Sequence, residues 1–158
     1  MIHFFDLARW LLGEEPIEVF AMASCMVDPA IGEAGDVDTS MVMMKTASGA
    51  LCHINSSRRA AYGYDERIEV FGSEGMVQST NPRPKSVHYY TAEGSRQEGT
   101  FDSWLDRFLD SYRVELDHFI DAIEAGTKPM VTEQDGRMAL VLADAALRSY
   151  ETGSPVRI

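Results

Sequence analysis

Cysteine, long apolar runs and positive charge are all scarce in this sequence, and each scarcity excludes a class of protein. Only two cysteines occur, Cys25 and Cys52, and neither lies in a CxxC or zinc-type spacing. Buried, reduced thiols are the simplest interpretation and predict a cytoplasmic protein, with a bridge between the two as the alternative. No apolar run approaches the roughly 20 residues that a membrane-spanning helix requires, and the N-terminus carries no signal-peptide pattern.

The charge balance and the glycine pattern exclude phosphate-rich ligands. The chain has 14 basic and 25 acidic residues and a formal net charge of -11, so its surface repels nucleic acid and anionic membranes. Neither GxGxxG nor GxxxxGK followed by Ser or Thr is present, and Gly72–Gly75 predicts a hairpin turn instead. We therefore expect the isolated chain to bind neither NAD nor NADP. The four histidines show no metal-ligating spacing, so no metal site is expected either.

Hydrophobic periodicity divides the chain into a helix, a series of strands and two further helices. Helical spacing covers residues 2–12, and this helix starts so close to the first residue that the chain resembles a piece of something longer. Alternating patterns then predict about six strands, at 17–23, 39–47, 50–56, 66–71, 76–79 and 86–91, with a loop rich in Gly, Pro and acid at 28–38. The last third predicts helices at 104–126 and 132–150, the first with a wide apolar stripe.

This order of elements predicts the fold class. Strands that follow one another without an intervening helix pair antiparallel, because parallel neighbours need a crossover connection. The expected fold is α+β: an open, mostly antiparallel β-sheet of about six strands with helices packed on one face, and no Rossmann domain. We expect residues 1–158 to form a single domain. The methionine-rich run Met41–Met44 is expected in a core or an interface, since methionine fills irregular apolar space.

Two groups of residues could carry chemistry, and each also has a plainer structural interpretation. His3 and Asp6 lie three positions apart on the first predicted helix, where they form either a catalytic pair or a surface pair. Tyr62, Tyr64 and Asp65 fall in a predicted loop between strands. Phenols beside a carboxylate suit a neutral polyhydroxylated ligand, but the same residues also suit a polar loop without a ligand.

Several longer motifs follow one another along nearly the whole chain. The first is Ile2–Gly13, with the sequence IHFFDLARWLLG. The later ones are Ala47–Ala50, Ser57–Arg59, Tyr62–Asp65, Glu69–Gly75, Tyr112–Leu116 and Gly153–Ile158. In this order and spacing they resemble the glucose–fructose oxidoreductase and myo-inositol dehydrogenase family. The Tyr-Gly-Tyr-Asp segment is most similar to that of the inositol 2-dehydrogenases in the family.

The resemblance implies a function and a role for particular residues. Members of this family join an N-terminal Rossmann domain, which binds NAD or NADP, to a C-terminal domain with an open antiparallel sheet, and the substrate lies between the two. This chain would then be the C-terminal substrate-binding and oligomerisation domain of an enzyme that oxidises a secondary hydroxyl of a cyclitol or sugar. His3 matches the catalytic histidine and Tyr64 a phenol of the inositol pocket. Asp6 matches an acid with an orienting role, and Tyr62 joins the expected substrate-binding residues.

The departures from the family pattern limit what the chain can do alone. The family's catalytic lysine belongs to the Rossmann half, and the aspartate expected four residues before His3 would precede Met1. Phe4 stands where the family usually has an acid. We therefore expect the isolated chain to be inactive. The alternatives are an oligomerisation or scaffold domain, which forms a homo-oligomer through the outer sheet face, and a stand-alone polyol-binding module.

Overall fold

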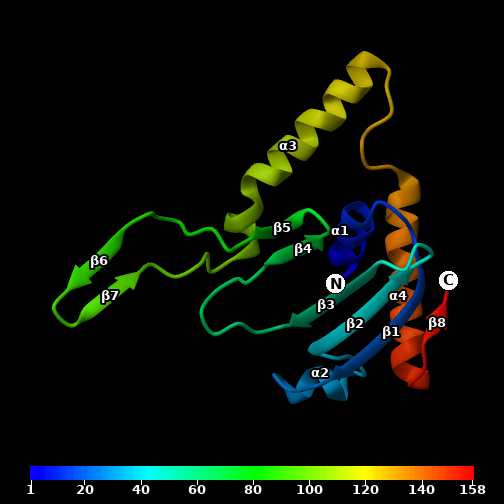
Figure 1. The fold of residues 1–158 in the computed structure, drawn as a ribbon, viewed down its shortest axis with the longest axis horizontal. Helices are drawn as coiled ribbons and strands as arrows, with labels where there is room; N and C mark the ends of the chain where they lie inside the picture. The colour runs from blue at the N-terminus through cyan, green and yellow to red at the C-terminus, as the bar shows by residue number, and fades with distance from the viewer. The chain divides into compact units, whose positions relative to one another are not determined.

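The computed structural model describes residues 1–158, whose elements fall into two compact units, 1–59 with 130–158 and 60–129. The first unit contains α1 (Ile2–Leu12), β1 (Pro16–Ser24), α2 (Pro29–Glu33), β2 (Thr39–Thr46), β3 (Leu51–Ser57), α4 (Glu133–Thr152) and β8 (Val156–Arg157). The second unit contains β4 (Ile68–Gly72), β5 (Gly75–Ser79), β6 (His88–Thr91), β7 (Gly94–Gln97) and α3 (Trp104–Ala125), as Figure 1 shows.

A four-stranded antiparallel sheet forms the centre of the first unit. Its strand order is β3-β2-β1-β8, and α4 packs against β1 and β8 (Figure 1). Successive side chains of a strand point to opposite faces, so alternate residues of β1 and β2 are buried beneath α1 and α4. The core consists of Phe5, Ala8, Val19, Ala21, Val42, Met44, Ala139, Leu142, Ala145 and Ala146. The two helices therefore cover one face of the sheet.

Local signals set the helix boundaries of the first unit where the sequence predicts them. Gly13 ends α1 in the left-handed conformation, with φ 68°, which a glycine adopts without steric cost. At the start of α4, Thr132 and Asp135 form a capping box, in which the Thr132 backbone N–H donates to the Asp135 carboxylate at 2.8 Å. Gly153 ends α4 in the same way as Gly13 ends α1.

The two-residue strand β8 is joined to the sheet partly by a buried serine of α4. Val156 pairs with Val19 of β1, and in this register Ala21 would lie opposite Ser154, two positions further along. The Ser149 hydroxyl lies between these two residues: it accepts from the Ala21 backbone N–H at 2.9 Å and donates to the Ser154 carbonyl at 2.8 Å. Ser149 thus completes the ladder where β8 has no further residue to offer.

The second unit consists of two separate hairpins, β4–β5 and β6–β7, and the long helix α3. The Ser103 hydroxyl caps α3 by accepting from the Leu105 backbone N–H at 3.0 Å. Gly126 ends the helix in the left-handed conformation. The predicted apolar stripe of α3 lies largely exposed, with Ala122 as its one buried residue.

The α+β class and the antiparallel pairing predicted from the sequence are confirmed, but the division of the strands differs. The structure has eight strands in sheets of four, two and two rather than about six in one sheet. Two of the strands, β7 and β8, have no strong alternating pattern of their own. The expected loop at 28–38 also contains α2, whose N-cap Asp28 accepts from the Ala30 backbone N–H. Short elements of this kind depend on partners and caps that periodicity does not detect.

Three further features bear on the compartment and ligand classes considered above. No helix has both the length and the apolar character that crossing a bilayer requires. No three His, Cys, Asp or Glu side chains are grouped so that they could hold a metal ion. Cys25 and Cys52 are both free thiols, but Cys25 is exposed and Cys52 only partly buried, so the expected burial is wrong for Cys25. Partial burial raises the pKa of the Cys52 thiol.

Candidate functional site

The first two candidate residues lie on α1, in the first unit. His3 is exposed, while Asp6 is partly buried. The Asp6 carboxylate pairs with Arg9 one turn further along, with 3.0 Å between Oδ1 and Nη1, and no hydrogen bond joins it to His3. The helix therefore presents the imidazole to solvent and engages the carboxylate elsewhere.

Arg9 connects the end of α1 to the start of α4. Its Nε donates to Glu15 at 2.7 Å, and its Nη2 lies 3.3 Å from the Asp135 carboxylate. The hydrogen bond to Glu15 is the largest of the effects that hold the pKa of Arg9 above its ordinary value. By pairing with Arg9, Asp6 belongs to this network.

The other two candidate residues lie in a loop that opens the second unit. The backbone N–H of Tyr64 donates to the Phe101 carbonyl at 2.6 Å, and the Thr100 hydroxyl donates to the Tyr62 carbonyl at 3.0 Å. Between the two tyrosines, Gly63 has φ 111°, a conformation in which a side chain would be strained. A Cβ atom there would also collide with the Thr100 hydroxyl. The tyrosine loop, residues 62–65, is thus held tightly against residues 100–101.

The carboxylate of Asp65 is the centre of the polar contacts around this loop. It receives Arg67 Nε at 2.8 Å, Arg67 Nη2 at 2.9 Å, Asn81 Nδ2 at 2.6 Å and the Tyr62 hydroxyl. Burial opposes the ionisation of Asp65, but these donors outweigh it and lower the pKa of Asp65 to about 2. The same contact to Asp65 is the largest cause of the raised pKa of Tyr62. At neutral pH the group is therefore a fully ionised carboxylate surrounded by donors.

Tyr64 has a different environment from Tyr62. Its ring meets Phe108 edge to face, with 5.7 Å between centroids and 89° between planes, and its hydroxyl donates weakly to Glu66 at 3.3 Å. Burial and then the charge of Glu66 raise the pKa of Tyr64, so the phenol keeps its proton at neutral pH. The guanidinium of Arg107 lies 4.7 Å from the Phe108 ring centroid. Tyr64 thus holds a protonated hydroxyl whose only hydrogen bond is the long contact to Glu66.

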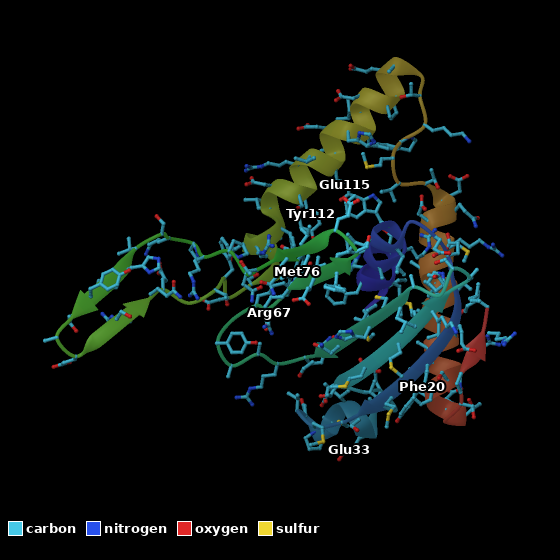
Figure 2. All side chains as sticks on the ribbon, viewed as in Figure 1. Phe20, Glu33, Arg67, Met76, Tyr112 and Glu115 are labelled. Carbon is cyan, nitrogen blue, oxygen red and sulfur yellow. The ribbon has the colours of Figure 1, made fainter.

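A shallow polar hollow of about 370 Å³ lies beside the loop. It is lined by Tyr62, Asp65, Arg67, Thr80, Asn81, Arg83 and Thr100. Arg67 directly precedes β4 and is labelled in Figure 2. Of the four residues that sequence reasoning selected, only Tyr62 lines this hollow. Asp65 was noted as part of the loop motif, but Asn81 carried no signal, because its contact spans 16 positions of the chain.

The structure brings the candidate residues together in pairs. His3 and Asp6 share a helix of the first unit, and Tyr62 and Tyr64 share a loop of the second. All strand pairs are antiparallel, so the chain has no β-α-β crossover of the kind that binds dinucleotides. Residues 1–158 thus contain no Rossmann fold.

The comparison with known proteins covers the chain from end to end. Residues 1–158 match the family described as "Oxidoreductase family, C-terminal alpha/beta domain". The inositol 2-dehydrogenase of Rhizobium meliloti is 49% identical over 148 residues, which is 94% of this chain and 45% of that protein. The chain spans about half the length of the curated relatives it matches.

Solved structures of similar proteins agree with the fold. A probable dehydrogenase from Thermotoga maritima has a TM-score of 0.96 and 47% identity, covering 99% of this chain and 47% of that one. The scyllo-inositol dehydrogenase of Lactobacillus casei, described with bound NAD(H) and scyllo-inositol, has a TM-score of 0.89 and 25% identity, covering 99% and 46%. The expected likeness to inositol dehydrogenases is confirmed by these matches.

Proposed function

We propose that this chain supplies the substrate side of an inositol dehydrogenase. It belongs to the oxidoreductase family whose C-terminal alpha/beta domain it matches over residues 1–158. The complete enzyme would oxidise a secondary hydroxyl of a cyclitol or sugar to a ketone. Residues 1–158 would act as one domain made of the two compact units. The observation that supports the proposal is the tightly held loop at 62–65, which carries Tyr64, the residue that the family resemblance matches to a phenol of the inositol pocket.

The proposed reaction would use residues of this chain together with residues of a separate, nucleotide-binding part of the enzyme. Oxidation of a secondary alcohol removes a proton from the hydroxyl and a hydride from the carbon. NAD or NADP would accept the hydride, held by residues outside this chain. His3 is the residue we assign to the proton, because an imidazole readily exchanges one near neutral pH and this one is exposed on α1. Tyr64 would donate a hydrogen bond to a ring hydroxyl, and Asp6 would orient the helix end through Arg9.

An assembled enzyme tests this proposal directly. The segment of the Rhizobium meliloti relative that precedes its matched part is fused ahead of Met1, and NAD reduction is followed with myo-inositol and scyllo-inositol. We expect turnover by the fusion and none by the 158-residue chain alone. The His3→Ala variant should lose about a hundredfold or more in kcat while NAD affinity is unchanged. Turnover retained by His3→Ala would remove His3 from the mechanism, and reduction of NAD by the chain alone would overturn the division of labour.

A second function is favoured by the uncovered face of the four-stranded sheet. This outer face carries Phe20, Met22, Met41, Met43, Leu51 and His53, with Phe20 opposite Met43 and Met22 opposite Met41. Met22, Met41, Met43 and Leu51 are all exposed, and Phe20 is labelled in Figure 2 on β1. An apolar patch of this kind marks an interaction surface. We propose that it joins two copies of the chain into a homo-oligomer.

Size-exclusion chromatography with light scattering distinguishes a homo-oligomer from a monomer. The wild-type chain should be at least a dimer at micromolar concentration, whereas Met41→Lys with Met43→Lys should be a monomer of unchanged helix content. Glu74→Lys, in the exposed turn of the second unit, is the matched control and should leave the mass unchanged. A wild-type chain that is monomeric at this concentration would contradict the proposed interface.

One alternative function and the cellular location can also be tested. A stand-alone polyol-binding module would release heat on titration with myo-inositol, and we expect the isolated chain to release none. The free thiols of Cys25 and Cys52 support a reducing, cytoplasmic location. To test that location, the two thiols are labelled with a thiol reagent in intact cells, and the labelled fraction is compared with that of the same chain after export. A larger labelled fraction without export would support a cytoplasmic location.

A further inference from the structure

We propose that Asp65 is a positioning residue that fixes the tyrosine loop, and that Tyr62 acts through Asp65 rather than by touching the substrate. This inference rests on the proposed function, because it concerns how Tyr64 is presented to a polyol. It revises the expectation from the sequence that both tyrosines bind the substrate. The two phenols lie two positions apart in the chain but have different partners.

The first argument is that Asp65 has no remaining capacity for a ligand. A carboxylate offers about four lone-pair positions. Oδ1 accepts from Arg67 Nε and Asn81 Nδ2, and Oδ2 accepts from Arg67 Nη2 and the Tyr62 hydroxyl. The carboxyl side chain is only 14% exposed. A substrate hydroxyl would therefore have to displace one of these donors, so the role of Asp65 lies within the protein.

The second argument concerns the phenol of Tyr62. Its one hydroxyl proton is already donated to Asp65. By contrast, the Tyr64 hydroxyl has only the long contact of 3.3 Å to Glu66. Both acceptors are carboxylates, so a polyol that accepts a hydrogen bond would exchange the long contact of Tyr64 more readily than the closer contact of Tyr62. Tyr64 is thus the better direct ligand, and Tyr62 the better support.

The third argument is that Asp65 connects the loop to a distant segment of the same unit. Asn81 uses both ends of its amide: Nδ2 donates to Asp65, and Oδ1 accepts from the Glu66 backbone N–H at 2.8 Å. From the other side, Thr100 and Phe101 hold the loop backbone. Tyr64 lies between these two attachments. Loss of the Asp65 charge would loosen the first attachment only, so the loop would remain folded but less well ordered.

Pre-organisation of this kind affects substrate affinity before it affects folding. A binding group that must be ordered on each encounter weakens binding by the cost of that ordering, and a small misplacement slows the chemistry. A variant that merely unfolds a fraction of the enzyme behaves differently. It lowers kcat in proportion to the folded fraction and leaves the KM for the polyol unchanged.

The test uses the assembled enzyme and a double-mutant cycle. Asp65→Asn keeps the shape of the side chain and removes its charge, and Tyr62→Phe removes only the hydroxyl. We expect each to raise the KM for inositol by about tenfold with the KM for NAD unchanged, and the double variant to raise it no further. Tyr64→Phe combined with Asp65→Asn should likewise raise the KM no further than Tyr64→Phe alone, because Asp65 acts by placing the Tyr64 hydroxyl. Glu74→Gln, an exposed carboxylate outside the network, is the control and should match the wild type.

The outcomes separate this inference from the proposed function. An assembled wild-type enzyme that turns over no polyol overturns the proposed function and, with it, the role given to Asp65. An active wild type with an unchanged inositol KM in Asp65→Asn overturns only the positioning role. Additive effects of Tyr62→Phe and Asp65→Asn would mean that Tyr62 contacts the substrate itself, which also overturns it.

Discussion

Replacement of Ser149 by alanine should destabilise the first unit more than its single lost hydroxyl suggests. Ser149 is fully buried, and its hydroxyl joins the Ala21 backbone N–H to the Ser154 carbonyl. Without it, the N–H of Ala21, itself a core residue, loses its partner in a dry environment. An unsatisfied buried donor costs about 1–3 kcal/mol, and loss of the second hydrogen bond adds about 0.5–1.5 kcal/mol. The expected total is about 1.5–4.5 kcal/mol.

Urea unfolding of the isolated chain measures this loss. Far-UV circular dichroism follows the whole chain, and Trp10 fluorescence in a Trp104→Phe background follows the first unit, because each unit carries one tryptophan. Ser154→Ala is the matched control: it removes a hydroxyl from the same turn, where the side chain is exposed and its contact to the Thr152 carbonyl is 3.5 Å long. A Ser149→Ala midpoint equal to that of Ser154→Ala would refute the bridging role of Ser149.

Two further predictions concern a buried carboxylate and a glycine in a conformation that only glycine adopts readily. Burial opposes the ionisation of Asp38, but four donors hold its pKa well below its ordinary value. They are the backbone N–H groups of Met26, Asp28 and Val27 and the Thr39 hydroxyl. The stability that this ionised carboxylate contributes is present above about pH 4 and is lost as the pH falls further. Wild type should therefore have a higher free energy of unfolding in urea than Asp38→Asn at pH 7, and this difference should shrink steadily as the pH is lowered below about 4. A difference that does not change with pH would contradict this. Gly63→Ala should lower the free energy of unfolding by about 1–3 kcal/mol and raise the inositol KM of the assembled enzyme, because its Cβ would collide with Thr100 and lie 2.8 Å from the Phe101 carbonyl oxygen. Gly136→Ala, which has open space around its Cβ, is the control. Equal stability and KM for the two variants would refute the constraint on the loop.

The family resemblance and the structure together change the reading of the candidate residues. The sequence placed Tyr62 and Tyr64 together as phenols of one motif. In the structure the Tyr62 hydroxyl donates to Asp65, whereas the Tyr64 hydroxyl has only a longer contact to Glu66. The roles of His3, Asp6 and the two tyrosines toward a substrate stay predictions, and the assembled enzyme tests them.

Sequence alone determined the elements that depend on local patterns. The period of 3.6 and the flanking glycines predicted α1, α3 and α4, and the alternating run on either side of Ser48-Gly49 predicted the β2–β3 hairpin, all of which the structure contains. These signals succeed because a helix or a hairpin forms its hydrogen bonds between residues close in the chain. The motifs in order along the chain also identified the family, since they need no three-dimensional information.

Only the tertiary structure decided which strands share a sheet, and which polar groups meet. β8 has two residues and is held by Ser149 of α4, and Asp65 meets Asn81 across 16 positions. Neither contact follows from periodicity, because a buried hydroxyl or carboxylate is stabilised by whichever donors the fold brings to it. For the same reason the stripe on α3 was visible in the sequence, while its exposure was not: periodicity reports that a face is apolar, and only the packing of the chain determines what covers it.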